Sequence, residues 1–144
     1  MLLHLSIMIN ISTWLIPDRI FWKDSAKEVI LPTLSGQLGV LTNHISLLTG
    51  LDIGIISVRK NASSDWTNFV VTGGFALVND NKVTILVNEA ELSSDINPEE
   101  AEANFLSTKL ALDSAVEGKK KLEISSQYKK ARARFQVIQS GSIK

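Results

Sequence analysis

The sequence predicts an α+β protein in which an N-terminal β-sandwich or β-barrel is followed by a C-terminal pair of helices. Three observations lead to this prediction. Short apolar, β-branched runs separated by Gly, Asn, Asp and Pro fill residues 1–92. From residue 93 the apolar residues follow a helical period instead, and the balance of charge changes at nearly the same point. We therefore expect two domains, residues 1–92 and residues 93–144.

The N-terminal domain is expected to contain many short strands, whose close spacing favours a sandwich or a barrel. The apolar start of the chain lacks the basic region of a signal peptide, so we assign it to the first strand. The last two strands should form a hairpin through Asn79-Asp80-Asn81, because Asn and Asp tolerate the left-handed backbone of tight turns. The expected strands are residues 3–9, 20–22, 28–33, 38–41, 53–59, 67–72, 75–78 and 83–88.

The first helix of the C-terminal domain has a clear start. Asn97 is a suitable N-cap, Pro98 suits the first helical position, and Glu100 occupies the capping-box position. Acidic side chains in the first turn complement the helix dipole. The alanine-rich run continues to about Val116, and Gly118 is placed to end the helix.

A second helix is expected from about residue 119 to residue 138. Its apolar residues form one narrow stripe, which consists of Ile124, Tyr128, Ala131, Phe135 and Ile138. Since the break between the two helices is short, we expect them to fold back as an antiparallel hairpin.

Charge is distributed unevenly along the chain, although the net charge is zero. Residues 1–88 are neutral, residues 89–117 carry eight acidic side chains against Lys109 alone, and residues 118–144 carry eight basic side chains against Glu123 alone. The acidic first helix is therefore expected to lie beside the basic second helix. Each ion pair on such a solvated face contributes only about 0–1 kcal/mol, so this attraction would be adjustable.

The sequence offers little material for a catalytic or metal site. It contains no cysteine, and its two histidines, His4 and His44, lie in different expected strands or loops. Gly73-Gly74 is typical of a bend or bulge rather than a phosphate-binding loop, because a strand follows it. We expect no catalytic residue, no cofactor and no metal ligand.

A dense basic cluster in the second helix consists of Lys129, Lys130, Arg132 and Arg134. It is either a solvated helix face, or a surface that docks onto an acidic protein, or a nucleic-acid-binding surface. The last is the weakest of the three, because Tyr128 and Phe135 belong to the core-facing stripe and the β domain is neutral rather than basic.

Residues 36–44 read GQLGVLTNH and resemble the signature of the epsilon subunit of F-type ATP synthases. Residues 73–75, 83–90 and 95–101 resemble that family as well, and residues 130–134 are similar to its plastid-type members. The resemblance covers nearly the whole chain in the right order, so it is more specific than any one of these motifs.

The resemblance implies a ten-stranded β-sandwich followed by a two-helix hairpin. It also implies a non-catalytic rotor subunit that binds the gamma subunit, stands on the ring of c subunits, and couples proton-driven rotation to ATP synthesis elsewhere in the complex. A plastid-type member would be peripheral to the thylakoid membrane on its stromal side. The residues expected to face the c ring are Gly36, Gln37, Gly39, Asn43 and His44.

In this family the helical hairpin can extend along gamma and inhibit ATP hydrolysis. The resemblance then places Lys129, Lys130, Arg132 and Arg134 against an acidic segment of the beta subunits in the alpha/beta head. The alternative is a β-domain adaptor whose basic helix binds nucleic acid or an acidic protein.

The chain departs from the family pattern in several places. Gln37 stands where many relatives have Glu, and Ile45-Ser46 follows the glycine stretch where relatives usually have Ala-Pro. Some bacterial relatives bind ATP through an Ile-Asp-x-x-Arg-Ala pattern, in which Asn97 and Glu100 replace the Asp and the Arg here. We therefore expect no ATP binding. The chain is also longer than usual around residues 9–16.

Overall fold

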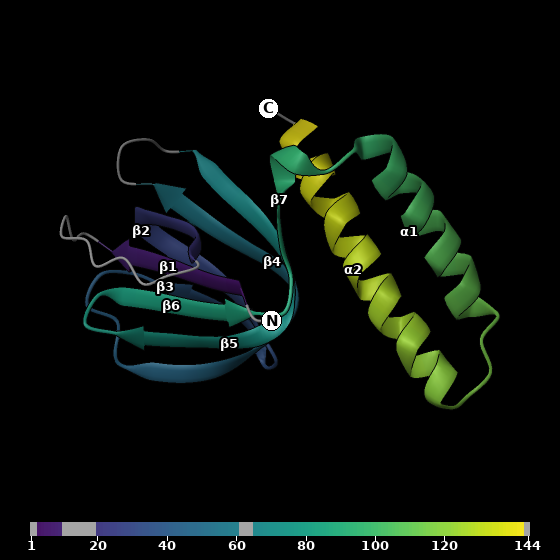
Figure 1. The fold of residues 1–144 in the computed structure, drawn as a ribbon, viewed down its shortest axis with the longest axis horizontal. Coiled ribbons are helices and arrows are strands. Elements are labelled where there is room, and N and C mark those ends of the chain that lie inside the picture. The colour runs from purple at the N-terminus through teal and green to yellow at the C-terminus, as the bar shows by residue number, and fades with distance from the viewer. Residues whose placement is uncertain (1–2, 10–19, 61–64, 143–144) are drawn as a thin grey trace.

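The computed structural model describes residues 3–9, 20–60 and 65–142, which form a β-sheet followed by two helices (Figure 1). The long segment around residues 9–16 lies mostly outside the described residues. The strands are β1 (Leu3–Ile9), β2 (Ile20–Thr33), β3 (Gly36–Val40), β4 (Leu47–Lys60), β5 (Trp66–Asn79), β6 (Lys82–Val87) and β7 (Ala90–Leu92). A short 3-10 turn, η1 (Ser93–Asp95), leads to α1 (Pro98–Asp113) and α2 (Lys119–Ser142). The expected order of a β part followed by a helical part is confirmed.

The sheet closes on itself into a sandwich-like body. Its strand order is β1-β6-β5-β4-β2-β3, and β1 pairs with β2 as well as with β6. The β1–β2 pairing is parallel, and the other pairings are antiparallel. Closure leaves fewer unpaired strand edges. The interior is filled by aliphatic and aromatic side chains, of which Phe69, Leu31, Ile56 and Ile85 are the largest fully buried ones.

The expected number of ten strands was wrong for the described residues, which hold seven. Three of these strands, β2, β4 and β5, are 14 residues long. They change partners along their length: β5 pairs with β6 through residues 74–79 and with β7 through residues 69–71. Runs that the sequence presents as separate strands, such as residues 67–72 and 75–78, are therefore parts of one continuous strand.

The change of partner in β5 occurs at Gly73 and Gly74. Both have positive φ, +98° and +153°, a region that other residues rarely adopt. A Cβ atom at Gly74 would overlap the carbonyl oxygen of Leu86 on β6. The two glycines thus form a bend, as expected, at which backbone pairing passes from β6 to the segment that contains Glu89, whose carbonyl accepts a hydrogen bond from the N–H of Thr72 at 3.2 Å.

Helix α1 begins as expected and ends earlier than expected. The Asn97 side chain accepts hydrogen bonds from the N–H groups of Glu99 at 3.0 Å and Glu100 at 3.2 Å. The helix ends at Asp113 rather than near residue 116, and the hydroxyl of its C-cap, Ser114, donates to the carbonyl of Leu110 at 2.8 Å. Gly118 does not end α1 but directly precedes α2, with a φ of +140°.

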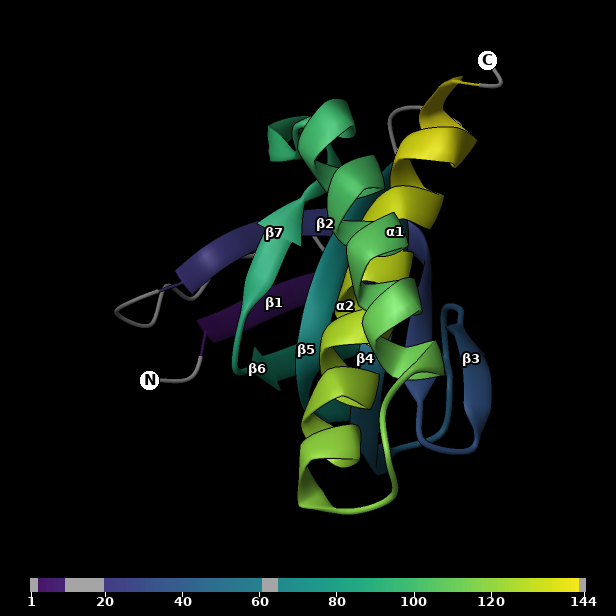
Figure 2. The same cartoon turned by 90° about the vertical axis from the view of Figure 1, so that its right-hand side faces the viewer.

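Helix α2 lies between α1 and the sandwich (Figures 1 and 2). Its expected apolar stripe faces α1, where Phe105 stacks on Tyr128 and Phe135 at centroid distances of 5.9 Å and 4.8 Å. A second face carries Ala133 and Val137, which pack with the buried side chains of Val70 on β5, Ile96 between η1 and α1, and Ala101 on α1. The expected hairpin is therefore present. The expected single apolar stripe accounts for the face of α2 that packs on α1, but not for the second face, which packs on the sandwich. Neither α1 nor α2 is long and apolar enough to span a membrane.

Replacing Gly74 by Ala should destabilise the fold by more than about 2 kcal/mol, because the new Cβ meets β6 backbone at a strained φ. Gly39→Ala is the matched control, since the nearest atom to a Cβ there is Glu28 Oε1 at 3.9 Å. Urea-induced unfolding measures both variants. Equal unfolding midpoints for the two would contradict this account of the bend.

Candidate functional site

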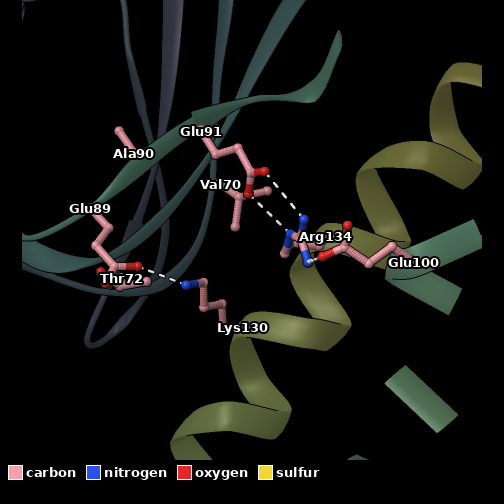
Figure 3. A pocket seen from close by; sticks show the side chains of 8 residues that line it. All are labelled: Val70, Thr72, Glu89, Ala90, Glu91, Glu100, Lys130 and Arg134. Atoms are coloured by element: carbon pink, nitrogen blue, oxygen red, sulfur yellow. Dashed lines mark hydrogen bonds and ion pairs between the residues drawn. The ribbon is translucent and has the colours of Figure 1, made fainter. Parts of the chain in front are cut away.

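Two basic residues of α2, Lys130 and Arg134, point at acidic residues of the sandwich (Figure 3). Lys130 Nζ lies 2.7 Å from Glu89 Oε2. Arg134 donates from Nε to Glu91 Oε2 at 3.0 Å and from Nη2 to Glu91 Oε1 at 3.2 Å. These contacts attach α2 to the segment that leads into and forms β7. We call them the docking contacts of the helical hairpin.

Two simple periodicities produce the docking contacts. Lys130 and Arg134 are four residues apart on a helix, so they lie on one face. Glu89 and Glu91 flank Ala90 in extended backbone, so their side chains leave on one side. Two cations spaced by a helical turn thus meet two carboxylates spaced by two strand residues.

Arg134 is the centre of this junction. Its side chain is only 12% exposed, and in addition to Glu91 it faces Glu100, whose Oε1 is 3.8 Å from Arg134 Nη1. Glu100 lies in the first turn of α1. A single guanidinium therefore joins the sandwich, α1 and α2. Two-pronged Arg–carboxylate hydrogen bonds of this kind are among the stronger polar contacts in proteins.

Helix α1 lies beside α2 as expected, but the expected ion pairing between the acidic first helix and the basic second helix is largely absent from the described residues. Within residues 98–142, Glu100–Arg134 is the ion pair that joins α1 to α2. Lys130 pairs with the sandwich instead, and so does Lys129, whose Nζ is 3.7 Å from Asp52 Oδ2 on β4. The physical reason is that α2 lies between α1 and the sheet, with Lys129, Lys130 and Arg134 on its sheet side.

Arg132 differs from the other three basic residues. It is exposed, and it has no ion pair among the described residues. It lines a hollow of about 310 Å³ between α2 and the sheet, together with Lys129, Asp52 and Gln37.

The five residues of the glycine stretch do not form one cluster. Gly36, with a φ of +120°, and Gln37 lie at the β2–β3 turn, at one end of β3. Asn43 and His44 lie beyond the other end of β3, next to the β5–β6 turn, where the Asn43 N–H donates to Asn81 Oδ1 at 2.7 Å. Gly39 lies between them, opposite Ile30 of β2. His44 contacts its own loop, with Nδ1 2.8 Å from the carbonyl of Ile45.

A hollow of about 500 Å³ surrounds the docking contacts (Figure 3). Three carboxylates, those of Glu89, Glu91 and Glu100, line it against two cations, Lys130 and Arg134. Glu100 is the residue that stands in place of the Arg of the bacterial nucleotide pattern, and here it faces Arg134. An entering phosphate group would meet a net negative lining whose cations are already paired.

An exposed apolar face on the sandwich was not anticipated from the sequence. Leu48 of β4 pairs with Leu77 of β5, and Phe75 of β5 pairs with Leu86 of β6. Their side chains are between 37% and 69% exposed. The sequence of β5 does contain a sign of this face. Ala76 and Val78 supply the buried side of the strand, so the alternate residues Phe75 and Leu77 should point outward, and both are apolar.

Within the residues that the structure describes, no group of three or more His, Cys, Asp and Glu side chains is arranged to hold a metal ion.

Comparison with known proteins gives a consistent picture. Residues 13–93 match the family described as the ATP synthase, Delta/Epsilon chain, beta-sandwich domain. The chain is 61% identical over 125 residues to the chloroplastic ATP synthase epsilon chain of Euglena gracilis, which covers 87% of this chain and 93% of that one. The corresponding chain of Tupiella akineta is 52% identical over 86% of this chain and 94% of its own length.

One solved structure that resembles this fold is a chain in the cryo-EM structure of the Euglena gracilis mitochondrial ATP synthase, OSCP/F1/c-ring. The TM-score is 0.68 at 19% identity, and the alignment covers 96% of this chain and 80% of that chain. At this identity the likeness is one of fold.

ATP should not bind to the docking hollow, because Glu91 and Glu100 already occupy Arg134 and leave a net negative lining. Isothermal titration of the full chain with Mg-ATP should give no measurable heat. A micromolar dissociation constant would contradict the prediction. The variant Glu100→Arg tests whether the negative charge at position 100 prevents ATP binding, because this change reverses the charge at the position that departs from the bacterial pattern.

Proposed function

The chain belongs to the family of ATP synthase delta/epsilon chains, and from this membership we infer that it is the epsilon subunit of an F-type ATP synthase of the plastid type. The observation that carries this conclusion is the 61% identity to a chloroplastic epsilon chain over most of both chains. It is a non-catalytic rotor subunit, peripheral to the thylakoid membrane on the stromal side. Its partners are the gamma subunit, the c ring and the alpha/beta catalytic head, where rotation is converted into ATP synthesis.

The end of the sandwich that carries Asn43 and His44 is the proposed contact with the c ring. Both residues are in an irregular loop, and the Asn43–Asn81 hydrogen bond ties this loop to the β5–β6 turn. A loop anchored in this way presents a fixed surface, on which the apolar side chains of Leu41 and Ile45 are also exposed. The family signature also assigns Gly36, Gln37 and Gly39 to the proposed c-ring contact, although Gly36 and Gln37 lie at the other end of β3 and Gln37 lines a hollow beside α2.

The apolar face of β4, β5 and β6 is the proposed contact with gamma. The hairpin packs through α2 against β4 and β5 near Val70 and Ile55, whereas Leu48, Phe75, Leu77 and Leu86 remain exposed. A rotor subunit must remain attached while it turns, and paired exposed apolar residues supply the burial that such an attachment needs.

The helical hairpin is proposed to inhibit ATP hydrolysis when it leaves the sandwich. In the docked state, carboxylates of the same chain hold Lys129, Lys130 and Arg134. On release, these cations become available to an acidic segment of the beta subunits. The same side chains thus take part in both states, and the balance depends on which set of carboxylates holds them more firmly.

Separate domains are proposed for residues 1–92 and residues 93–144. The positions of the elements support this division. The last strand ends at Leu92, and the first α-helix begins at Pro98. A hairpin that undocks without unfolding the sandwich requires such a division.

A nucleic-acid-binding function is less favoured. Three of the four cations in the basic cluster face carboxylates at 2.7–3.7 Å, so they are not free to contact phosphates in the docked state. DNA binding with a steep dependence on salt would be the result that favours this alternative.

Inhibition of ATP hydrolysis should respond in opposite directions to two substitutions in the reconstituted enzyme. Arg132→Ala removes a cation that the docked state does not use, so inhibition should weaken by about two- to five-fold. Glu91→Gln weakens docking, so inhibition should strengthen. Lys121→Gln is the control, because Lys121 pairs with Glu117 beside the α1–α2 connection, at 3.0 Å.

Two further variants set the limits of the inhibition that this experiment can measure. Replacement of all four basic residues by Ala should relieve inhibition without abolishing assembly, and a chain of residues 1–92 provides the reference without a hairpin. Unchanged inhibition by the fourfold variant would contradict the proposal.

Gamma binding should depend on the apolar face. Leu77→Asp places a charge at the centre of that face and should weaken binding to gamma by about ten-fold or more. Leu110→Asp on α1 is the control, since Leu110 is equally apolar and 70% exposed. Both chains should fold, because both side chains are exposed. Equal gamma affinity of the two variants in a binding titration would rule out this face as the contact.

A further inference from the structure

Gln37 lines two hollows that α2 also lines. The first, of about 310 Å³, is lined by Arg132 and Gln136 of α2 as well. The second, of about 540 Å³, is lined by Val137 and Ser140 of α2. Residue 37 therefore lies beside two turns of the docked helix, although it belongs to the glycine stretch of the sandwich.

The first hollow is short of negative charge. Lys129 and Arg132 line it with a single carboxylate, Asp52, which is 3.7 Å from Lys129. Arg132 has no ion pair among the described residues, whereas Lys130 and Arg134 reach carboxylates at 2.7 Å and 3.0 Å. Gln37 contributes a neutral amide where a carboxylate would balance the hollow.

Residue 37 can change without disturbing the core. It is exposed, and it lies on β3, which pairs with β2 alone within the described part of the sheet. Its register partner is Pro32, which also lines the first hollow. A different side chain at position 37 thus alters the charge that α2 meets and, in the assembled enzyme, the proposed contact with the c ring, but it leaves the buried core of the sandwich unchanged.

We propose that residue 37 is a tuning position for the helical hairpin: its charge, acting on Arg132, sets how firmly α2 docks on the sandwich. A neutral Gln leaves docking weak at this point, and a carboxylate would strengthen it. This inference rests on the proposed function for its consequence, which is that position 37 adjusts inhibition of ATP hydrolysis. Suppose that a partner subunit also contacts residue 37. By linkage, docking of α2 changes the affinity for that partner by some factor, and binding of the partner changes the docking equilibrium by the same factor.

The test uses Gln37→Glu, Arg132→Gln and the double variant in the full chain. Hydrogen exchange of amides in α2 reports how often the helix leaves the sheet. Gln37→Glu should slow this exchange by about two- to five-fold, as for one exposed ion pair, and high salt should remove the gain. In the Arg132→Gln background the same change should give no gain.

Ser35→Glu is the matched control, because it adds the same charge two residues away on the exposed turn, and Ser35 lines neither hollow. An equal gain from Ser35→Glu, or a gain from Gln37→Glu that persists without Arg132, would overturn the proposal.

Reconstitution separates this proposal from the proposed function. Gln37→Glu should weaken inhibition of ATP hydrolysis by a similar factor. Slower exchange with unchanged inhibition would support position 37 as the tuning position and would contradict the inhibitory role of the hairpin. Unchanged exchange would overturn the tuning position, whatever the effect on hydrolysis.

Discussion

The paired hydrogen bonds between Arg134 and Glu91 hold the two parts of this molecule together. The apolar contact beneath them is small, since α2 contributes mainly Ala133 and Val137 to it. Docking therefore depends on polar contacts more than most packing within a domain does. Removing one partner of a half-buried pair leaves the other charge without compensation, which makes Arg134 and Glu91 sensitive points of control.

This arrangement explains how one helix can serve two states. Lys130–Glu89 and Lys129–Asp52 are exposed pairs, and such pairs contribute about 0–1 kcal/mol each and weaken with salt. Under the proposed function, acidic residues on another subunit would replace the carboxylates of such weak pairs. Glu100 facing Arg134 fits a switch in this chain that works without bound nucleotide.

Local features of the fold could be predicted from the sequence, and long-range ones could not. The bounds of β1, the turn after β5 and the Asn97 cap follow from the chemistry of neighbouring residues. The continuity of β5 through Gly73-Gly74 depends on pairing with distant strands. The partners of Lys130 and Arg134 were also missed, because the charge pattern located the acidic segment correctly but could not tell that Glu89 and Glu91, rather than α1, would face α2.

A double-mutant cycle of Glu91→Gln and Arg134→Gln tests the central claim most directly, with hydrogen exchange of α2 amides in the full chain as the measure of docking. We predict that each single variant increases opening and that the two effects are far from additive, with a coupling of about 1–2 kcal/mol. A parallel cycle of Glu117→Gln and Lys121→Gln should show little coupling in the same measurement. Additive effects of Glu91→Gln and Arg134→Gln would contradict the claim that this contact holds the hairpin on the sandwich.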